Sequence, residues 1–165
     1  MQNNVVCNAS PLIFLAKIGM LELLNHYVVH IPVQVESEIL KGFLRRKADA
    51  TLIVEHLKGR KIVSVRTNII KALPDFLGSG EKAVISLAVK EKIDKVFIDE
   101  AKARTVARLY GLYPSGTLGI LWNSYKMGNI DKTRLETLLF ELLEKGYKIK
   151  EELFLAFIKK IRDSS

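Results

Sequence analysis

The sequence predicts a parallel α/β protein, arranged as a three-layer α/β/α sandwich around a central sheet of four or five strands. Short apolar, β-branched runs alternate along the chain with longer stretches whose apolar residues recur at helical spacing. Strands joined through helices imply right-handed parallel crossovers. A chain of 165 residues, 48% hydrophobic and 27% charged, has the size and composition of one globular domain. We therefore expect a single domain over residues 1–165.

The strand pattern occurs in four runs and, more weakly, in a fifth. The predicted strands are residues 5–7, 28–31, 61–65 and 95–98, with 112–114 as a short edge strand. Runs of this length and composition are typical of strands buried inside a parallel sheet. The lone cysteine, Cys7, falls in the first of them, so we expect a buried and unreactive thiol.

The helix pattern fills the stretches between these strands. Ser10 and Pro11 are predicted as N-cap and first residue of a helix that Gly19 ends. Pro32 opens a helix that ends near Gly42. The other predicted helices are 20–26, 48–58, 80–92, 101–110, 117–126, 132–144 and 150–161, and residues 66–79 form a connection. The helices from about residue 131 follow the last strand, so we expect them to cover the sheet or to form an interface.

Composition excludes several classes of protein. One cysteine permits neither an intrachain disulfide nor a cysteine-rich zinc site. No stretch approaches the roughly 18 apolar residues of a membrane-spanning helix. The first residues lack the basic and small-residue pattern of a secretory signal. These features lead us to expect a cytoplasmic protein with no membrane association.

The charge favours a nucleic-acid partner. The chain carries 26 Lys and Arg against 18 Asp and Glu, a net charge of +8. Residues 41–71 alone hold nine basic residues, including Arg45, Arg46 and Lys47, against two acidic ones. Such a patch attracts phosphate backbones by counterion release. Further along, Lys102, Arg104 and Arg108 follow the fourth strand and are further candidates for contacting RNA. A merely solvated face is the alternative for both groups.

Polar side chains suited to a hard cation follow two of the strands. Asn8 and the Ser10 hydroxyl come after the first strand, and Asp99 and Glu100 after the fourth. Ligands gather at the carboxyl ends of strands in open parallel sheets. Two helices add carboxylates near their starts, Glu38 and Glu81. Carboxylate and amide oxygens suit Mg²⁺ or Mn²⁺, which could activate water and stabilise charge on a phosphodiester.

Each carboxylate also has a simpler interpretation. Glu81 would complement the dipole of its helix, Asp99 would cap the helix that follows it, and Glu38 would be solvated. Their joint placement at one edge of the sheet is what favours a functional site.

Four spaced motifs resemble the PIN-domain family. They are VVCNASPLIFLAKIG, HIPVQVESEIL, GSGEKAVISLA and KVFIDEAKARTVARLYGL, and the resemblance extends over roughly residues 4–150. They look most like a PIN-like branch long labelled only as a domain of unknown function and often grouped with VapC-type toxins. PIN domains are metal-dependent ribonucleases with a quartet of acidic residues at the carboxyl edge of a parallel sheet.

The resemblance places that quartet at Asn8, Glu38, Glu81 and Asp99, with Ser10 as the accompanying hydroxyl. The sequence differs from the usual family pattern at two of these positions. PIN nucleases usually have aspartate where this chain has Asn8, which offers a neutral amide oxygen and one negative charge fewer. Glu81 replaces the more usual aspartate and adds one methylene of reach. We therefore expect a Mg²⁺- or Mn²⁺-dependent ribonuclease weakened by Asn8.

Two functions follow from these features. The first is a metal-dependent endoribonuclease, the toxin of a toxin–antitoxin pair; the resemblance also implies a homodimer and a small antitoxin that masks the site. The second is a PIN-like module that binds RNA or a protein with little or no catalysis, which Asn8 and the basic segment favour. Loss of RNA cleavage in EDTA would separate the two.

Overall fold

A five-stranded parallel sheet forms the centre of the protein, as the computed structural model describes it for residues 3–59 and 61–164. Its strands are β1 (Asn4–Cys7), β2 (Val28–Pro32), β3 (Ile62–Val65), β4 (Lys95–Phe97) and β5 (Tyr113–Ser115). They lie in the order β3-β2-β1-β4-β5, and every pair of neighbours is parallel. The predicted α/β fold is confirmed, and the weak fifth run forms an edge strand.

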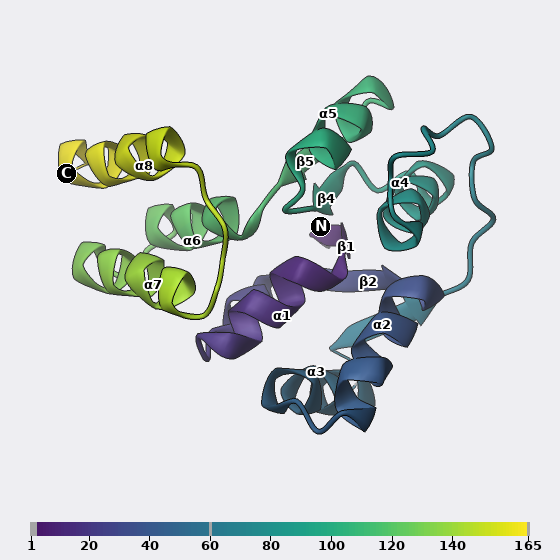
Figure 1. Ribbon diagram of the computed structural model, residues 1–165, viewed down its shortest axis with the longest axis horizontal. Coiled ribbons are helices and arrows are strands. Elements are labelled where there is room, and N and C mark those ends of the chain that lie inside the picture. The colour runs from purple at the N-terminus through teal and green to yellow at the C-terminus, as the bar shows by residue number, and fades with distance from the viewer. Residues whose placement is uncertain (1–2, 60, 165) are drawn as a thin grey trace.

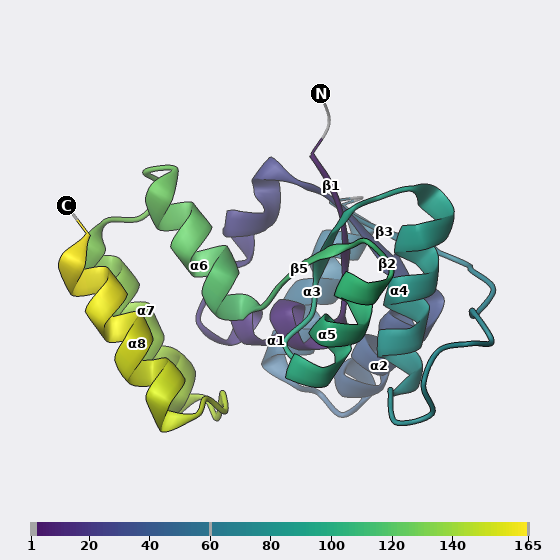
Figure 2. The same ribbon diagram turned by 90° about the horizontal axis from the view of Figure 1, so that it is seen from above.

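Helices cover both faces of the sheet. They are α1 (Ala9–Lys17), α2 (Val33–Leu44), α3 (Ala48–Lys58), α4 (Ser79–Glu91) and α5 (Ala101–Leu109), with the 3₁₀ helix η1 (Leu21–His26) after α1. Right-handed crossovers place α1 to α3 on one face and α4 and α5 on the other. Figures 1 and 2 show this arrangement.

Strand β1 lies at the centre of the core. Val5, Val6 and Cys7 are completely buried, because β2 and β4 flank the strand and helices cover it above and below. Side chains buried on both faces explain the unbroken apolar run in the sequence. Cys7 is a free, buried cysteine, as predicted.

The last three helices form a group of their own beside α1. They are α6 (Thr117–Lys126), α7 (Lys132–Glu144) and α8 (Glu151–Asp163). Helix α6 contacts α1 and η1, α7 packs on α6, and α8 packs on α7. Figure 1 shows the group at the side of the molecule, away from α2 to α4. Leu135, Leu138, Leu139 and Leu142 are fully buried at the spacing of one helix face, and they hold α7 in place.

Among the described residues, no helix is long and apolar enough to span a membrane.

Two predicted helix ends are wrong. Helix α1 begins at Ala9, and its N-cap is Asn8 and not Ser10, because Asn8 Oδ1 accepts the Ala9 N–H at 2.9 Å. Helix α2 continues through Gly42 to Leu44. A Cβ at Gly42 would lie 3.2 Å from the Cβ of Ala50 in α3, so this glycine allows two helices to approach closely and does not end one.

The topology creates a crevice between β1 and β4. From β1 the chain proceeds towards β2 through α1, on one face; from β4 it proceeds towards β5 through α5, on the other. Parallel sheets bind ligands where the direction of strand order reverses in this way, at the carboxyl ends of the strands. Asn8 follows β1 and Asp99 lies just beyond β4, so both lie at this position.

Candidate functional site

A polar cavity of about 390 Å³ lies at this reversal point. We call it the acidic cavity; it is lined by Asn8, Ser10, Phe14, Glu81, Asp99, Glu100, Gly146, Tyr147 and Lys148. The structure therefore brings together four of the five residues predicted for catalysis, Asn8, Ser10, Glu81 and Asp99. Glu38, the fifth, does not line this cavity.

Asp99 is held by four hydrogen bonds from uncharged donors. Its Oδ2 accepts from Ser10 Oγ at 2.7 Å and from Thr117 Oγ1 at 2.8 Å. Its Oδ1 accepts from the Thr117 backbone N–H at 2.7 Å and from the Tyr147 hydroxyl at 2.9 Å. Across residues 3–59 and 61–164, no basic side chain forms a salt bridge with this carboxylate. The carboxylate is thus fixed in orientation while its charge stays unpaired.

Asp99 does cap a helix, but a different one from the helix we expected. The Thr117 N–H is the first of α6, 18 residues further along the chain, whereas α5 begins after Glu100 without a side-chain cap. A Cβ at Gly116 would lie only 2.9 Å from Asp99 Oδ1, so glycine is needed there for the α6 N-terminus to reach the carboxylate. Asp99 therefore joins the sheet to the C-terminal helices.

Tyr147 is the site residue that the sequence did not indicate. It follows Gly146, whose positive φ of 91° ends α7, and its own N–H bonds to the Leu142 carbonyl at 2.9 Å. Its ring packs edge-to-face against Phe14, with centroids 5.0 Å apart. Burial, and then the charge of Asp99, raise the pKa of Tyr147 above its usual range. The hydroxyl consequently remains a hydrogen-bond donor to Asp99 at physiological pH.

Asn8 and Glu38 converge above the first turn of α4. A Cβ at Gly80 would lie 3.0 Å from Asn8 Oδ1 and 3.7 Å from Glu38 Oε2, so both oxygens point at the same small volume. Glu38 is exposed on α2, where it can move without disturbing the core. The absence of a side chain at Gly80 leaves these two oxygens accessible.

Glu81 has the structural role that the simpler interpretation suggested. Its Oε2 accepts the Gly78 N–H at 2.8 Å, forming half of a capping box at the start of α4. It nevertheless lines the acidic cavity, as Asp99 does.

None of the six predicted RNA contacts lines the acidic cavity, and of the six only Arg104 is hydrogen-bonded to a residue that does. Its Nη1 donates to the backbone carbonyls of Asp99 and Ile98. Lys102 and Arg108 lie on α5 outside the cavity. The other three, Arg45, Arg46 and Lys47, form the turn between α2 and α3. Helix α2 is about 18 Å long with Glu38 at its middle, so the turn lies about 10 Å further along the helix than Glu38. Arg60, part of the same basic segment, lies outside the described residues.

The donor set fits an open magnesium or manganese site. Among the described residues there is no group of three or more His, Cys, Asp or Glu side chains placed to enclose a metal. Mg²⁺ does not need such a cage, since it keeps several waters and is usually held by one or two carboxylates together with substrate phosphate oxygens. Asp99, Glu81, Glu38 and the Asn8 amide supply only hard oxygen donors, which is the chemistry that this ion requires.

In a parallel α/β fold, carboxylates at the reversal point of the sheet lie where ligands bind. The PIN-domain family matches residues 4–163, and the chain belongs to it. Its members are generally nucleases that bind RNA, typically use divalent metal ions and often associate with antitoxins.

The comparison with solved structures supports the fold. A PilT N-terminus domain protein from the hyperthermophilic archaeon Sulfolobus solfataricus P2 superimposes with a TM-score of 0.58 at 16% sequence identity. The match covers 73% of this chain and 92% of that protein. No curated protein matches the chain in sequence.

Proposed function

We propose that this protein is a metal-dependent endoribonuclease that hydrolyses RNA phosphodiesters. The observation that carries the proposal is the acidic cavity, which collects Asn8, Glu81 and an unpaired Asp99 carboxylate at the reversal point of a PIN-domain sheet. Asp99, Glu81, Glu38 and Asn8 would hold Mg²⁺ or Mn²⁺. A metal bound there supplies a Lewis acid that lowers the pKa of water and stabilises charge on the phosphodiester.

The residues around the metal ligands would contribute positioning. Ser10, Thr117 and Tyr147 fix both oxygens of Asp99, so the carboxylate needs no reorganisation when a cation or substrate arrives. The resemblance implies Ser10 only as the hydroxyl that accompanies the quartet. Its hydrogen bond to Asp99 at 2.7 Å supports a role as a positioning residue for that carboxylate.

The test compares RNA cleavage by the wild type in Mn²⁺ with cleavage in EDTA and by the Glu38→Gln and Asp99→Asn variants. These variants keep the shape of each side chain and remove one negative charge. We expect cleavage to require the metal and to fall by at least about 100-fold in Asp99→Asn, which loses an electrostatic contribution of that order. Cleavage that persists in EDTA, or in Asp99→Asn, would contradict the proposal.

A second candidate is a PIN-like module that binds RNA or a protein without cutting it. Asn8 motivates it, because the amide supplies one charge fewer than the usual aspartate at the end of β1. The Asn8→Asp variant separates the two. Activity in the wild type supports the nuclease, whereas activity that appears only in Asn8→Asp supports the binding module. Binding that is weakened by salt but indifferent to EDTA would also support the binding module.

We further propose that the chain acts as a single PIN domain over residues 1–165, as the toxin of a toxin–antitoxin pair. Family membership and the basic surface support this role, with a homodimer and a small antitoxin as the expected partners. Growth arrest on expression of the wild type, relieved in Asp99→Asn, would be the expected result. Unimpaired growth with active, well-expressed protein would contradict the toxin role but not the nuclease.

A further inference from the structure

A second, larger cavity adjoins the acidic cavity. We call it the lateral cavity; its volume is about 600 Å³, and it lies between the start of α5, the β5–α6 connection and the segment that joins α7 to α8. Asp99, Glu100, Tyr147 and Lys148 line both cavities, so the two share one wall. The two cavities are therefore adjacent at Asp99.

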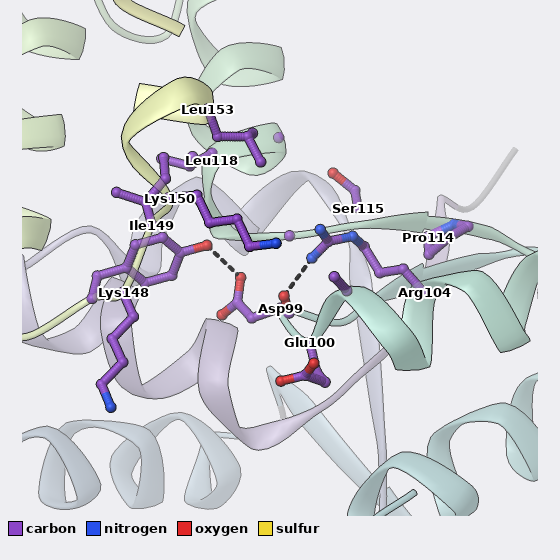
Figure 3. Close-up of a pocket in the computed structure, with 14 residues that line it drawn as sticks. Asp99, Glu100, Arg104, Pro114, Ser115, Leu118, Lys148, Ile149, Lys150 and Leu153 are labelled. Atoms are coloured by element: carbon purple, nitrogen blue, oxygen red, sulfur yellow. Dashed lines mark hydrogen bonds between the residues drawn. The ribbon is translucent and has the colours of Figure 1, made fainter. Parts of the chain in front are cut away.

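The lateral cavity adds cations to the two carboxylates, Asp99 and Glu100, that it shares with the acidic cavity. Arg104 comes from α5 and Lys150 from the start of α8, and Figure 3 shows the Lys150 ammonium pointing towards the Arg104 guanidinium. Over the described part of the chain, neither side chain forms a salt bridge with a carboxylate. Two cations that face each other in this way repel, and an anion between them would relieve the repulsion. The guanidinium is also pre-oriented, because its Nη1 is bonded to the Asp99 and Ile98 carbonyls.

The rest of the wall is largely apolar. Pro114, Leu118, Ile149 and Leu153 contribute hydrocarbon surface, and Figure 3 shows Leu118 and Leu153 beside Lys150. Leu153 is 51% exposed although it is a large apolar side chain. An apolar surface beside two cations suits a ligand with an aromatic ring and a phosphate, which is the composition of a nucleotide.

From this arrangement we propose that the lateral cavity is a nucleotide subsite, occupied by the residue of the RNA next to the scissile phosphodiester. Arg104 and Lys150 bind the phosphate of that nucleotide, and its base lies against Leu118 and Leu153. The inference rests on the proposed nuclease function, since the shared wall places this nucleotide beside Asp99. The subsite would align RNA across the acidic cavity.

Binding in EDTA tests the subsite without catalysis. The probe is a fluorescein-labelled, 2′-O-methyl RNA pentanucleotide, and fluorescence anisotropy measures its Kd. The cavity variants are Lys150→Gln and Leu153→Ser. Their controls are Lys145→Gln, at the other end of the same connecting segment, and Leu155→Ser, which is 56% exposed on the same helix. Neither control residue lines either cavity. Arg104 is left intact because it also holds the Asp99 backbone.

We expect Lys150→Gln and Leu153→Ser each to weaken binding about five- to tenfold, and each control by less than twofold. Wild-type affinity in both cavity variants, or equal losses in the controls, would overturn the subsite. AMP is tested as a competitor of the pentanucleotide. If AMP binds as tightly as the pentanucleotide, the cavity is a free-nucleotide site and the assignment to RNA is overturned.

The binding and cleavage experiments can show separately whether the subsite or the nuclease proposal fails. Cleavage that requires metal and Asp99, with no difference between cavity and control variants, rejects the subsite and leaves the nuclease intact. The expected binding pattern without any metal-dependent cleavage supports the subsite and rejects the nuclease.

Discussion

At the scale of single residues, the Asp99 carboxylate is the most heavily engaged group of the site. Four donors from three separate parts of the chain hold it, and none is charged. Uncharged donors fix the position of a carboxylate without cancelling its negative charge. A group that binds a cation requires that charge. An arginine partner would have fixed the same geometry and competed with a metal for the charge.

Tyr147→Phe tests the contribution of the donor from the connection between α7 and α8. The phenyl ring keeps the edge contact with Phe14, while Asp99 Oδ1 loses one of its two hydrogen bonds. We expect the free energy of unfolding to fall by about 1–2 kcal/mol, since the bond is to a charged group and partly buried. Urea denaturation measures the change. The control is Tyr110→Phe, and an equal loss in both variants would mean that the Asp99 bond contributes nothing specific.

His30 provides a pH-dependent prediction away from the site. It lies on β2 and pairs with Asn4 Oδ1 at 3.1 Å; burial lowers its pKa, with a smaller opposing effect from Glu91. A folded-state pKa below the unfolded value of about 6.5 means that the unfolded chain binds the proton more readily. Stability from this residue is therefore present at pH 7 and is lost as pH falls through 6.5. We expect the midpoint of denaturation to depend less on pH between pH 7 and 5 in His30→Gln than in the wild type. The same pH dependence in both proteins would refute this.

At the scale of the elements, helix starts supply most of the site. Asn8 caps α1, Glu81 accepts the Gly78 N–H at the start of α4, and Asp99 caps α6. The starts of three helices are thus hydrogen-bonded to polar side chains that also line the acidic cavity, although Asp99 itself lies just beyond the end of β4. Such positions serve both purposes, because a helix N-terminus favours a negatively charged or acceptor side chain.

Glu81 variants separate its two roles. In Glu81→Gln the amide oxygen can still accept the Gly78 N–H, so we expect a stability change below about 0.5 kcal/mol, whereas Glu81→Ala loses the cap and about 1 kcal/mol. Both variants remove the negative charge, so both should lose metal-dependent cleavage. Thermal unfolding and cleavage are measured in parallel. Full activity in stable Glu81→Gln would show that Glu81 is only a cap.

The elements were largely predictable from the sequence, and the local errors have a common cause. Apolar runs such as residues 5–7 and 95–98 fixed the strands, because burial on both faces demands such runs. The N-cap of α1 was misplaced because Asn8 and Ser10 are both good caps, and only the position of Asp99 decides between them. Gly42 resembles a helix end, but it is required by the close approach of Ala50 in another helix.

The site was predictable only where it follows strands. Asn8 and Asp99 come directly after apolar runs, so the rule for parallel sheets brings them together. Tyr147 donates to Asp99 from a connection 48 residues further along the chain. No motif near Tyr147 in the sequence indicates that its hydroxyl belongs to the site. Its position depends on how the C-terminal helices pack beside α1, a tertiary property that no local pattern encodes.

At the scale of the whole molecule, the two charged features lie apart. The acidic cavity is at the carboxyl edge of the sheet, while Arg45, Arg46 and Lys47 form the turn at the far end of α2. Figure 1 shows that turn at the bottom of the view, well away from the start of α5. Cations this far from the acidic cavity contribute to the overall attraction of RNA more than to its positioning in the site.

The salt dependence of RNA binding tests this division. Each phosphate contact adds about 0.7 to the slope of log K against log salt for single strands. We expect the triple variant Arg45→Gln/Arg46→Gln/Lys47→Gln to bind a 30-nucleotide RNA with a shallower slope, and to bind a pentanucleotide like the wild type. A control triple variant, Lys90→Gln/Lys92→Gln/Lys95→Gln, has the same net charge. Equal effects in the two would mean that only total charge matters.

The central position of β1 also has a consequence for folding. Its pairing with β4 joins Val6 to Val96, so about 90 residues must be synthesised and arranged before the second neighbour arrives. Until then, β1 has one free edge of three fully apolar residues, able to pair with the same edge of another chain. Such distant pairings slow folding more than they affect stability. Refolding yield should therefore depend on protein concentration even though the finished sheet leaves no edge of β1 exposed.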